Sequence, residues 1–503
     1  MPVNSEEVTN VEFSNLFFLY ILLPAVMLIY FLMPDINRKN LALIIISLVF
    51  YSMGQPIYMV MMVGLSYLNY KFALRISSEE GSSLLIPVAV NIAVLAVFKY
   101  LDFFLSTIGL GVDGGLLMGG LKALIKGLNS VGFSFQEPST ILPIGISFYT
   151  FSAISYLADV YNRKIEPEEK FRNLLLYFMM FPKLLQGPIV RYEQIAYQLE
   201  DRNHHPRAMF EGAQRFLFGL AKKVLLADYC GRILSELNSG GEDTTLVGVW
   251  FAAVLFMFQI YYDFSGYSDM AIGLGKLFGF RYCENFDRPY LSLSVTEFWR
   301  RWHMSLGSFF REYVYIPLGG NRLGKPRQIF NMFVVWVLTG LWHGASWNFV
   351  IWGLYFFVIL VVEKHYMSTL EVLPDWVCRC VTLWLILVGW IIFSHENFTD
   401  LQAAFAAILG FGGFGTPGLG TRILNSVPLL LTCFVGCTMV PVYIRQIFNG
   451  ICGMGRRRKK TNQVTPLRIV HMAVSFAVMC LLLWLCTVSL VGSTSAPSIY
   501  GNF

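Results

Sequence analysis

Residues 294–353 read SVTEFWRRWHMSLGSFFREYVYIPLGGNRLGKPRQIFNMFVVWVLTGLWHGASWNFVIWG, a stretch that carries two histidines in different surroundings. His303 lies in a charged, amphipathic segment, whereas His343 ends an almost wholly apolar run. Placing an imidazole among hydrophobic helices is costly, so an ionisable residue inside a membrane is by default a candidate functional residue. We expect the rest of the chain to form a scaffold that holds this stretch at the depth of the bilayer.

The composition of the whole chain indicates a membrane protein. Of its 503 residues, 55% are hydrophobic and 14% are charged, whereas a soluble domain carries about 25% charged residues. Apolar runs recur throughout, so we expect a single all-α integral membrane domain over residues 1–503 rather than several soluble domains. The small net charge of +6 is attributed to cytoplasmic loops, and no nucleic-acid partner is expected.

The apolar runs predict a polytopic protein, because a helix needs roughly 20 mostly apolar residues to cross a bilayer. The candidate runs are residues 14–33, 41–54, 56–76, 84–107, 142–161, 178–194, 245–280, 328–342, 345–366, 376–394, 398–412, 426–447 and 467–491. Pro143, Gly145, Pro182 and Gly187 interrupt two of them and suggest re-entrant or broken helices. The prediction is therefore about 11 to 14 transmembrane or re-entrant helices.

The domain divides into three parts along the chain. We expect N-terminal helices with an outer loop over residues 1–141, a central core over 142–366 and further helices over 367–503. Within the first part, the glycine-rich residues 108–139 predict an external loop with a short interfacial helix. Residues 200–210 predict a solvated loop, because its adjacent histidines lack metal-binding spacing, and no metal site is expected.

Charged residues predict the orientation in the membrane. The N-terminus is acidic, Arg38 and Lys39 follow the first apolar run, and residues Arg456 to Lys460 are all basic. Basic loops stay in the cytoplasm. The prediction is a multi-pass protein of the bacterial inner membrane with its N-terminus outside.

The segment around His303 predicts one amphipathic helix. Ser294 and Glu297 match a capping box, which predicts a helix that starts near Val295. The residues that then recur at helical spacing are Trp299, His303, Leu306 and Phe310. This register places His303 on the apolar stripe, where it is either a functional residue or a core histidine hydrogen-bonded to a neighbour.

The segment around His343 predicts a helix that stops at the histidine, because Gly344 follows it. No charged residue lies between Arg327 and Glu363, so burial favours the neutral imidazole. A general base requires that neutral form. The alternative is a histidine that serves packing alone.

Other polar residues are weaker candidates. Asp263 and Asp269 lie in an apolar segment and are expected to pair with cations of another helix. Candidate donor-binding residues, which could form a basic inner rim for phosphates or be ordinary positive-inside loops, are Lys222, Lys223, Arg322, Lys325 and Arg327.

Five motifs together resemble the membrane-bound O-acyltransferase (MBOAT) family. They are LPIGISFYTF (142–151), FPKLLQGPIVRYEQ (181–194), QIYYDFSGYSDMAIGLGKLFG (259–279), WRRWHMSLGSFFREYVYIPLGGNR (299–322) and GLWHGASWNFVIWG (340–353). They occur in the family's order. The YIPLGGNR segment and the chain length are more similar to the branch of alginate O-acetyltransferase membrane subunits than to the teichoic-acid D-alanyl transfer proteins.

The resemblance implies a helical fold around a central tunnel, with residues 142–366 as the catalytic core. His343 would be the catalytic histidine and His303 the second family histidine. The oxyanion of the transition state could be stabilised by His303, by Asn348 or by backbone N–H groups.

The resemblance also implies the substrates and partners. The acyl donor would be acetyl-CoA or an acyl-carrier thioester at the cytoplasmic face, with no permanently bound cofactor. The acceptor would be a hydroxyl of an exported cell-surface polysaccharide, reached directly or through a secreted or periplasmic acyltransferase partner. Membrane lipid surrounds the protein. Within the family, the alternative is D-alanyl transfer to teichoic acid. Outside it, the alternatives are a transporter or flippase for acyl groups or lipid-linked sugars, for which broken helices are also typical, and a membrane anchor for a polymer-secretion complex.

Overall fold

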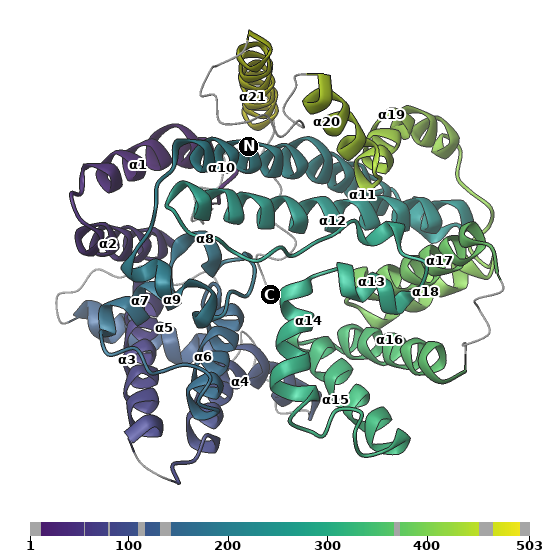
Figure 1. Cartoon of the computed structure of the whole chain (residues 1–503). Coiled ribbons are helices and arrows are strands. Elements are labelled where there is room, and N and C mark those ends of the chain that lie inside the picture. The colour runs from purple at the N-terminus through teal and green to yellow at the C-terminus, as the bar shows by residue number, and fades with distance from the viewer. Residues whose placement is uncertain are drawn as a thin grey trace.

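The computed structural model describes residues 12–54, 56–78, 81–108, 116–130, 142–366, 373–451 and 466–492. Across these ranges the regular structure is helical, without a strand (Figure 1). Seven of the described helices are long and apolar enough to cross a membrane. The all-α, polytopic fold is thereby confirmed. The estimate of about 11 to 14 helices also counted re-entrant and shorter segments, and it stays a prediction.

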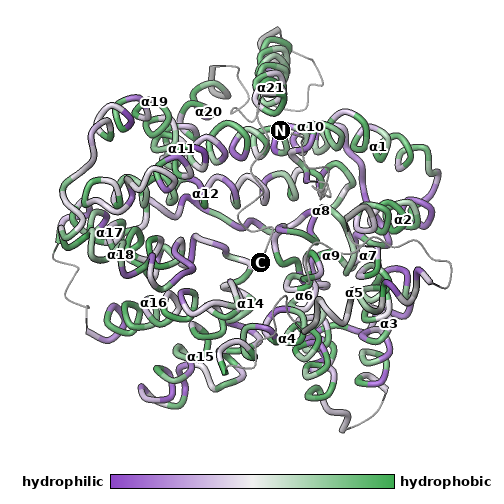
Figure 2. Tube along the Cα trace, turned by 180° about the vertical axis from the view of Figure 1, so that it is seen from behind, coloured by the Kyte–Doolittle hydropathy of each residue, from purple (hydrophilic) through white to green (hydrophobic). Residues whose placement is uncertain are grey.

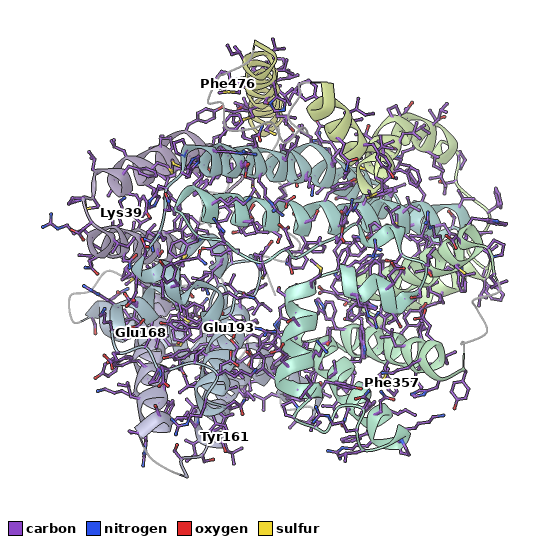
Figure 3. All side chains as sticks on the ribbon, viewed as in Figure 1. Lys39, Tyr161, Glu168, Glu193, Phe357 and Phe476 are labelled. Carbon is purple, nitrogen blue, oxygen red and sulfur yellow. The ribbon has the colours of Figure 1, made fainter. Side chains whose placement is uncertain are left out.

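The seven long apolar helices are α3 (Pro56–Ser78), α4 (Leu85–Thr107), α12 (Leu246–Leu277), α16 (Trp347–Tyr366), α17 (Asp375–Ser394), α19 (Leu419–Cys437) and residues Ile469–Gly492 of α21 (Pro466–Gly492). Two shorter apolar helices cover Phe18–Leu32 and Phe398–Ile408. Large apolar side chains on the outer helices face outward, as lipid contact requires: Phe476 of α21 is 61% exposed (Figure 3). Figure 2 shows the same hydrophobic periphery along the chain trace.

Two groups of helices form separate hydrophobic cores. The N-terminal lobe comprises η1 (Phe18–Leu22), α1 (Leu23–Leu32), α2 (Ile36–Gly54), α3, α4, α6 (Ile146–Tyr161), α7 (Phe171–Met179), α8 (Phe181–Leu184) and α9 (Tyr192–Glu200). The C-terminal lobe comprises η4 (Pro289–Leu291), α13 (Val295–Arg301), α15 (Lys325–His343), α16, α17 and α18 (Phe398–Ile408). Between the lobes, α14 (Met304–Phe310) and η5 (Arg311–Tyr315) pack in a further cluster that also contains Phe148 and Phe151 of α6.

The two lobes are joined by a helical layer that runs across both (Figure 1). This layer consists of α10 (Pro206–Ala221), η2 (Lys222–Ala227), α11 (Asp228–Ser239) and α12. Because α10, η2 and α11 follow one another without a break, they form one continuous helical stretch from Pro206 to Ser239. Helix α12 matches the predicted run over 245–280.

Glycines bring α10 and α12 into direct backbone contact. A Cβ on Gly219 would lie 2.5 Å from the carbonyl oxygen of Gly266, and a Cβ on Gly266 would lie 2.7 Å from that of Gly219. Small residues at such positions allow helices in a membrane to approach closely and gain van der Waals contact. The contact fixes the central layer against which both lobes pack.

The run over 142–161 is interrupted at its start, as predicted. Gly145 precedes α6 with a φ of 74°, and a Cβ there would lie 2.4 Å from the carbonyl oxygen of Leu184. Glycine satisfies both the left-handed conformation and the close contact. The run over 178–194 is likewise divided among α7, α8 and a loop before α9.

The solvated loop predicted at residues 200–210 is confirmed in part. Residues 201–205 form a loop in which Asp201, Asn203 and His205 are exposed, whereas α10 begins at Pro206. Arg202 is buried and donates to Asn40 Oδ1 at 2.7 Å, while His204 Nε2 lies 2.8 Å from Tyr30 OH. The polar composition indicated exposure throughout, but α1 and α2 supply partners that allow Arg202 to be buried and His204 to be half-buried.

The prediction of a single span at residues 426–447 is wrong, because α19 ends at Cys437 and α20 (Val440–Ile451) begins after a break. The Thr438 hydroxyl accepts a hydrogen bond from Val440 N at 3.2 Å, a local alternative to continued helix.

Some sequence predictions fall outside the described residues. These include the basic cluster Arg456 to Lys460 and the acidic residues before Glu12. Within the predicted outer loop at 108–139, the structure describes mainly α5 (Leu116–Ser130).

Substituting Gly266 by Ala should destabilise the protein, because the added methyl group meets a backbone oxygen that has no free rotamer to adopt. Overpacking of this kind costs about 1–3 kcal/mol. The measurement is the thermal midpoint of the purified protein in one detergent. Gly64→Ala is the matched control, because α3 leaves open space around Gly64 and alanine has the higher helix propensity. Equal midpoints for both variants would contradict a close contact between α10 and α12.

Candidate active site

His343 is the last residue of α15, as the sequence predicts. Its side chain is buried, at 2% exposed. Aromatic rings surround the imidazole, with centroid distances of 4.8 Å to Trp342, 4.9 Å to Trp352 and 5.3 Å to Phe393. The histidine is therefore held by packing on several sides at the end of a helix.

His303 does not lie inside a continuous helix, which corrects the predicted register. Helix α13 ends at Arg301, and His303 takes a left-handed conformation with φ 44° and ψ 53° before α14 begins. The predicted start is confirmed, since Ser294 Oγ accepts from Glu297 N at 3.0 Å. The carboxylate of Glu297, however, accepts from Leu293 N, so the reciprocal half of the capping box is not made with Ser294.

The break at His303 has a physical cause in a distant segment. The backbone of residues 285–287 pairs with the chain on both sides of the break: Met304 N donates to Asn285 O at 2.9 Å, and Asp287 N donates to Arg301 O at 2.9 Å. These bonds satisfy groups that a continuous helix would have paired internally.

The side chain of Asn285 orients His303. Its Oδ1 accepts from both the backbone N and the hydroxyl of Ser305, at 3.3 and 2.9 Å, which identifies this atom as the oxygen. His303 Nδ1 lies 3.0 Å from the same oxygen and must therefore donate. The lone pair of the neutral ring is then on Nε2, which has no hydrogen-bond partner among the described residues.

Sequence reasoning missed the role of Asn285 because it reads as part of a turn before Pro289. Nothing in its spacing from His303 indicates the contact.

Both histidines line one cavity of about 170 Å³ between α14–η5 and α15. Its lining residues are Trp299, Trp302, His303, Leu306, Gly307, Phe310, Arg311, Tyr315, Met332, Val335, Trp336, Thr339 and His343. The lining positions on α15 run from Met332 to His343, which corresponds to about 16 Å along a helix. The cavity thus extends from the histidines towards Arg311 and Tyr315.

Asn348 is buried, but it is not among the residues that line this cavity. Its Nδ2 donates to the carbonyl oxygen of Phe393 at 3.1 Å, so its N–H groups hold the end of α17. This placement does not support a contact with the oxyanion.

The five candidate donor-binding cations lie in two different settings. Lys222 pairs with Asp269 at 2.7 Å, and Lys223 pairs with Asp228 and Asp263 at 2.8 and 2.9 Å. The Lys223 side chain is 4% exposed, so it cannot form part of an exposed rim. The expected pairing of both aspartates with cations is confirmed.

The other three candidates lie where α15 begins. Arg322, Lys325 and Arg327 are exposed, and Arg327 Nε donates to Leu318 O. Among the residues that the structure describes, no group of histidine, cysteine and carboxylate side chains could hold a metal ion.

Comparison with known proteins agrees with this architecture. Residues 169–399 match the model of MBOAT, the membrane-bound O-acyltransferase family. The chain is 34% identical to the probable alginate O-acetylase AlgI of Pseudomonas putida, over 91% of each chain. The chain belongs to the MBOAT family. It is also 30% identical to the peptidoglycan O-acetyltransferase of Helicobacter pylori, over 80% of each chain.

A more distant relative is the teichoic acid D-alanyltransferase of Streptococcus thermophilus. It is 29% identical over 44% of this chain and 57% of the relative. This MBOAT protein is an O-acyltransferase embedded in a membrane by several helices. Family membership therefore favours acyl transfer over the transporter and membrane-anchor alternatives. His303 and His343 both lie within residues 169–399, which the family model matches.

Replacing Asn285 by Ala should lower acyl transfer by about 10²-fold, because His303 loses the acceptor that fixes its tautomer and orientation, and small misplacements of reacting groups have effects of that size. The measurement is single-turnover transfer by folded protein in nanodiscs. The control is Asn91→Ala, which also removes a buried amide but breaks the Asn69 contact in the N-terminal lobe. Full activity of the Asn285 variant would show that the orientation of His303 is unimportant.

Proposed function

We propose that the cavity between α14–η5 and α15 is the site of acyl transfer and that His343 is the general base. The strongest support is that two histidines, one at the break before α14 and one at the end of α15, line the same apolar cavity. Apolar cavities with a few polar groups are typical ligand sites. An apolar wall also excludes water, which would otherwise hydrolyse a thioester.

The chemistry follows from the substrates of an O-acyltransferase. His343 removes the proton of the acceptor hydroxyl as its oxygen attacks the thioester carbonyl carbon. The carbon–sulfur bond then breaks, and the thiolate leaves and takes up the proton. A positioned base of this kind contributes roughly 10²–10⁴-fold in rate. His303, with its lone pair on Nε2, can accept a hydrogen bond from a bound hydroxyl.

The donor would enter beside Arg311 and Tyr315, because the surrounding elements share a polar face. Arg172 donates to Asn37 Oδ1 at the start of α2, and Arg163 donates to Ser77 O at the end of α3. Lys164, next to Arg163, pairs with Glu312 at 3.5 Å, which places this basic segment after α6 against η5. By the positive-inside rule, we assign this face to the cytoplasm.

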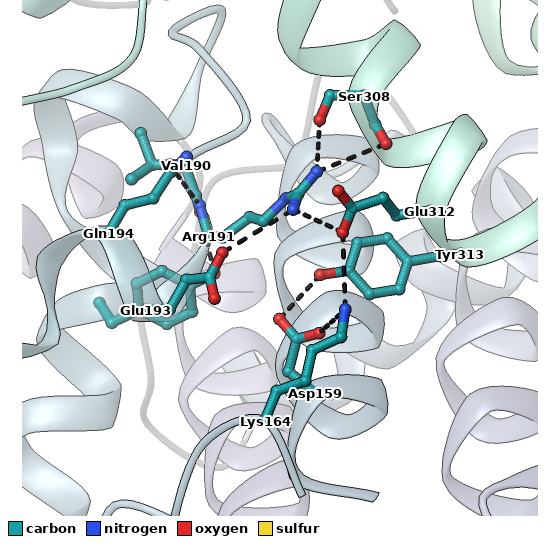
Figure 4. Close-up of polar contacts among 10 residues, drawn as sticks. Asp159, Lys164, Val190, Arg191, Glu193, Gln194, Ser308, Glu312 and Tyr313 are labelled. Carbon is teal, nitrogen blue, oxygen red and sulfur yellow. Dashed lines mark hydrogen bonds and ion pairs between the residues drawn. The ribbon is translucent and has the colours of Figure 1, made fainter. Parts of the chain in front are cut away.

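A charged network attaches η5 to the same face (Figure 4). Glu312 accepts from Arg191 at 2.7 Å and pairs with Lys164 at 3.5 Å, while Tyr313 OH donates to Asp159 at 2.7 Å. Burial alone would raise the pKa of Glu312, but Arg191 and Lys164 hold that pKa below its ordinary value. The network supports an ordered entrance next to the cavity.

We infer that the transferred group is acetyl and that its donor is acetyl-CoA or an acyl-carrier thioester. Acetyl transfer is preferred to D-alanyl transfer, because the O-acetylating relatives match far more of the chain. The acceptor would be a hydroxyl of an exported cell-surface polysaccharide, or of a secreted or periplasmic partner that relays the group. A protein with this role would reside in the bacterial inner membrane with its N-terminus outside.

His343→Gln and His343→Ala should both lower acyl transfer by roughly 10²–10⁴-fold, because neither side chain can accept and release a proton near neutral pH. The measurement is single-turnover transfer in detergent or nanodiscs, with folding checked by the thermal midpoint. His395→Gln, at the half-buried residue that follows α17, is the control. A folded His343→Gln protein with near wild-type turnover would exclude the general-base role.

Replacing Arg322, Lys325 and Arg327 together by Met should raise the KM for acetyl-CoA by roughly tenfold or more, since charge-assisted hydrogen bonds to phosphate are each worth about 1.5–3 kcal/mol. The KM for a phosphate-free acetyl thioester should not change. Arg207→Met, at another exposed position, is the control. An unchanged KM for acetyl-CoA would show that these residues do not bind the donor and serve only to keep their loop in the cytoplasm.

A further inference from the structure

Helix α4 carries an ammonium group into the apolar part of the protein. Lys99 lies well inside one of the seven long apolar helices, outside residues 169–399 that the family model matches. No carboxylate of the described residues pairs with it, and its hydrogen bond goes to the carbonyl oxygen of Trp342. A cation retained in such a place usually has a function, and its partner indicates which.

The partner is the end of the helix that carries His343. Lys99 Nζ donates to Trp342 O, and Tyr100 OH donates to Leu341 O at 2.6 Å. The last carbonyl groups of an α-helix have no partner within the helix. In the described structure, no backbone N–H beyond α15 donates to these two oxygens. Two side chains of α4 therefore supply the cap, and the ammonium also complements the negative end of the helix dipole.

The cap lies next to the two histidines of the proposed acyl-transfer cavity, with the Trp342 ring between them. Lys99 Nζ lies 5.9 Å from the centre of the Trp342 ring. The same ring lies 4.8 Å from that of His343 and 5.6 Å from that of His303. Because Trp342 and His343 are consecutive, a shift of the Trp342 carbonyl moves the imidazole that follows it.

We propose that Lys99 and Tyr100 are positioning residues that fix the last turn of α15 and thereby the orientation of His343. This inference rests on the proposed function of His343 as the base. It makes the N-terminal lobe part of the active site, although that lobe contributes no residue to the cavity wall. A misplacement of about 1 Å at a reacting group can lower the rate about 10²-fold.

The test compares Lys99→Met, Lys99→Arg and Tyr100→Phe in membrane vesicles supplied with radiolabelled acetyl-CoA. Lys99→Met should lower kcat about 10- to 100-fold and change the KM for acetyl-CoA less than about twofold, because donor binding is left intact. Lys99→Arg should recover most of the activity, because a guanidinium can donate to the same carbonyl. Lys71→Met is the control for losing a lysine, because Lys71 on α3 is exposed and its ammonium lies over the Tyr67 ring of the same helix.

Tyr100→Phe removes a single hydroxyl and keeps the test informative if Lys99→Met fails to fold. It should lower kcat with the same unchanged KM. Wild-type kcat in folded Tyr100→Phe and Lys99→Met would overturn the inference, as would Lys99→Arg being no better than Lys99→Met.

Combining Lys99→Met with His343→Gln separates this inference from the proposed function. If Lys99 acts through His343, the double variant should be no slower than His343→Gln alone, because residues that act as a unit are not additive. Additive losses would overturn the positioning role while leaving the base assignment intact. Near wild-type turnover of His343→Gln would instead remove the base assignment itself.

Discussion

The whole arrangement depends on one constraint: a backbone polar group inside a bilayer needs a partner within the protein. Each interrupted helix therefore has to find donors or acceptors elsewhere. The chain around Asn285 supplies them at the break before α14, and Lys99 and Tyr100 supply them at the end of α15. The two histidines occupy these two interruptions. The contacts that satisfy the backbone groups there therefore also position the two histidines.

The central layer gives these contacts a fixed frame. Helices α10 and α12 touch through glycines, and η2, which continues α10, is joined to α12 by the ion pair of Lys223 with Asp263 at 2.9 Å. Removing one partner of such a buried pair leaves an uncompensated charge, which is strongly destabilising. Steric fit and charge thus specify a single relative placement of the two helices on which both lobes are built.

The sequence was sufficient for features that depend on local pattern. Long apolar runs predicted α3, α4, α12, α16 and α17, and Gly344 after His343 predicted the end of α15. Features that depend on distant partners were not predictable. The periodicity around His303 is that of a helix, and only the bonds from residues 285–287 replace the helix there. Lys223 looked like a surface cation because Asp263 is remote in sequence, and Lys99 has no sequence neighbour that would connect it with His343.

The cap on α15 has a consequence for how the protein is made. Helix α4 enters the membrane long before α15 has been synthesised, so its ammonium is at first without the carbonyl that later receives it. A lysine in that position can extend its flexible stem and keep the ammonium hydrated near the membrane surface. Because α15 supplies the carbonyl that receives this ammonium, the surroundings of Lys99 are complete only when the second half of the chain is in place.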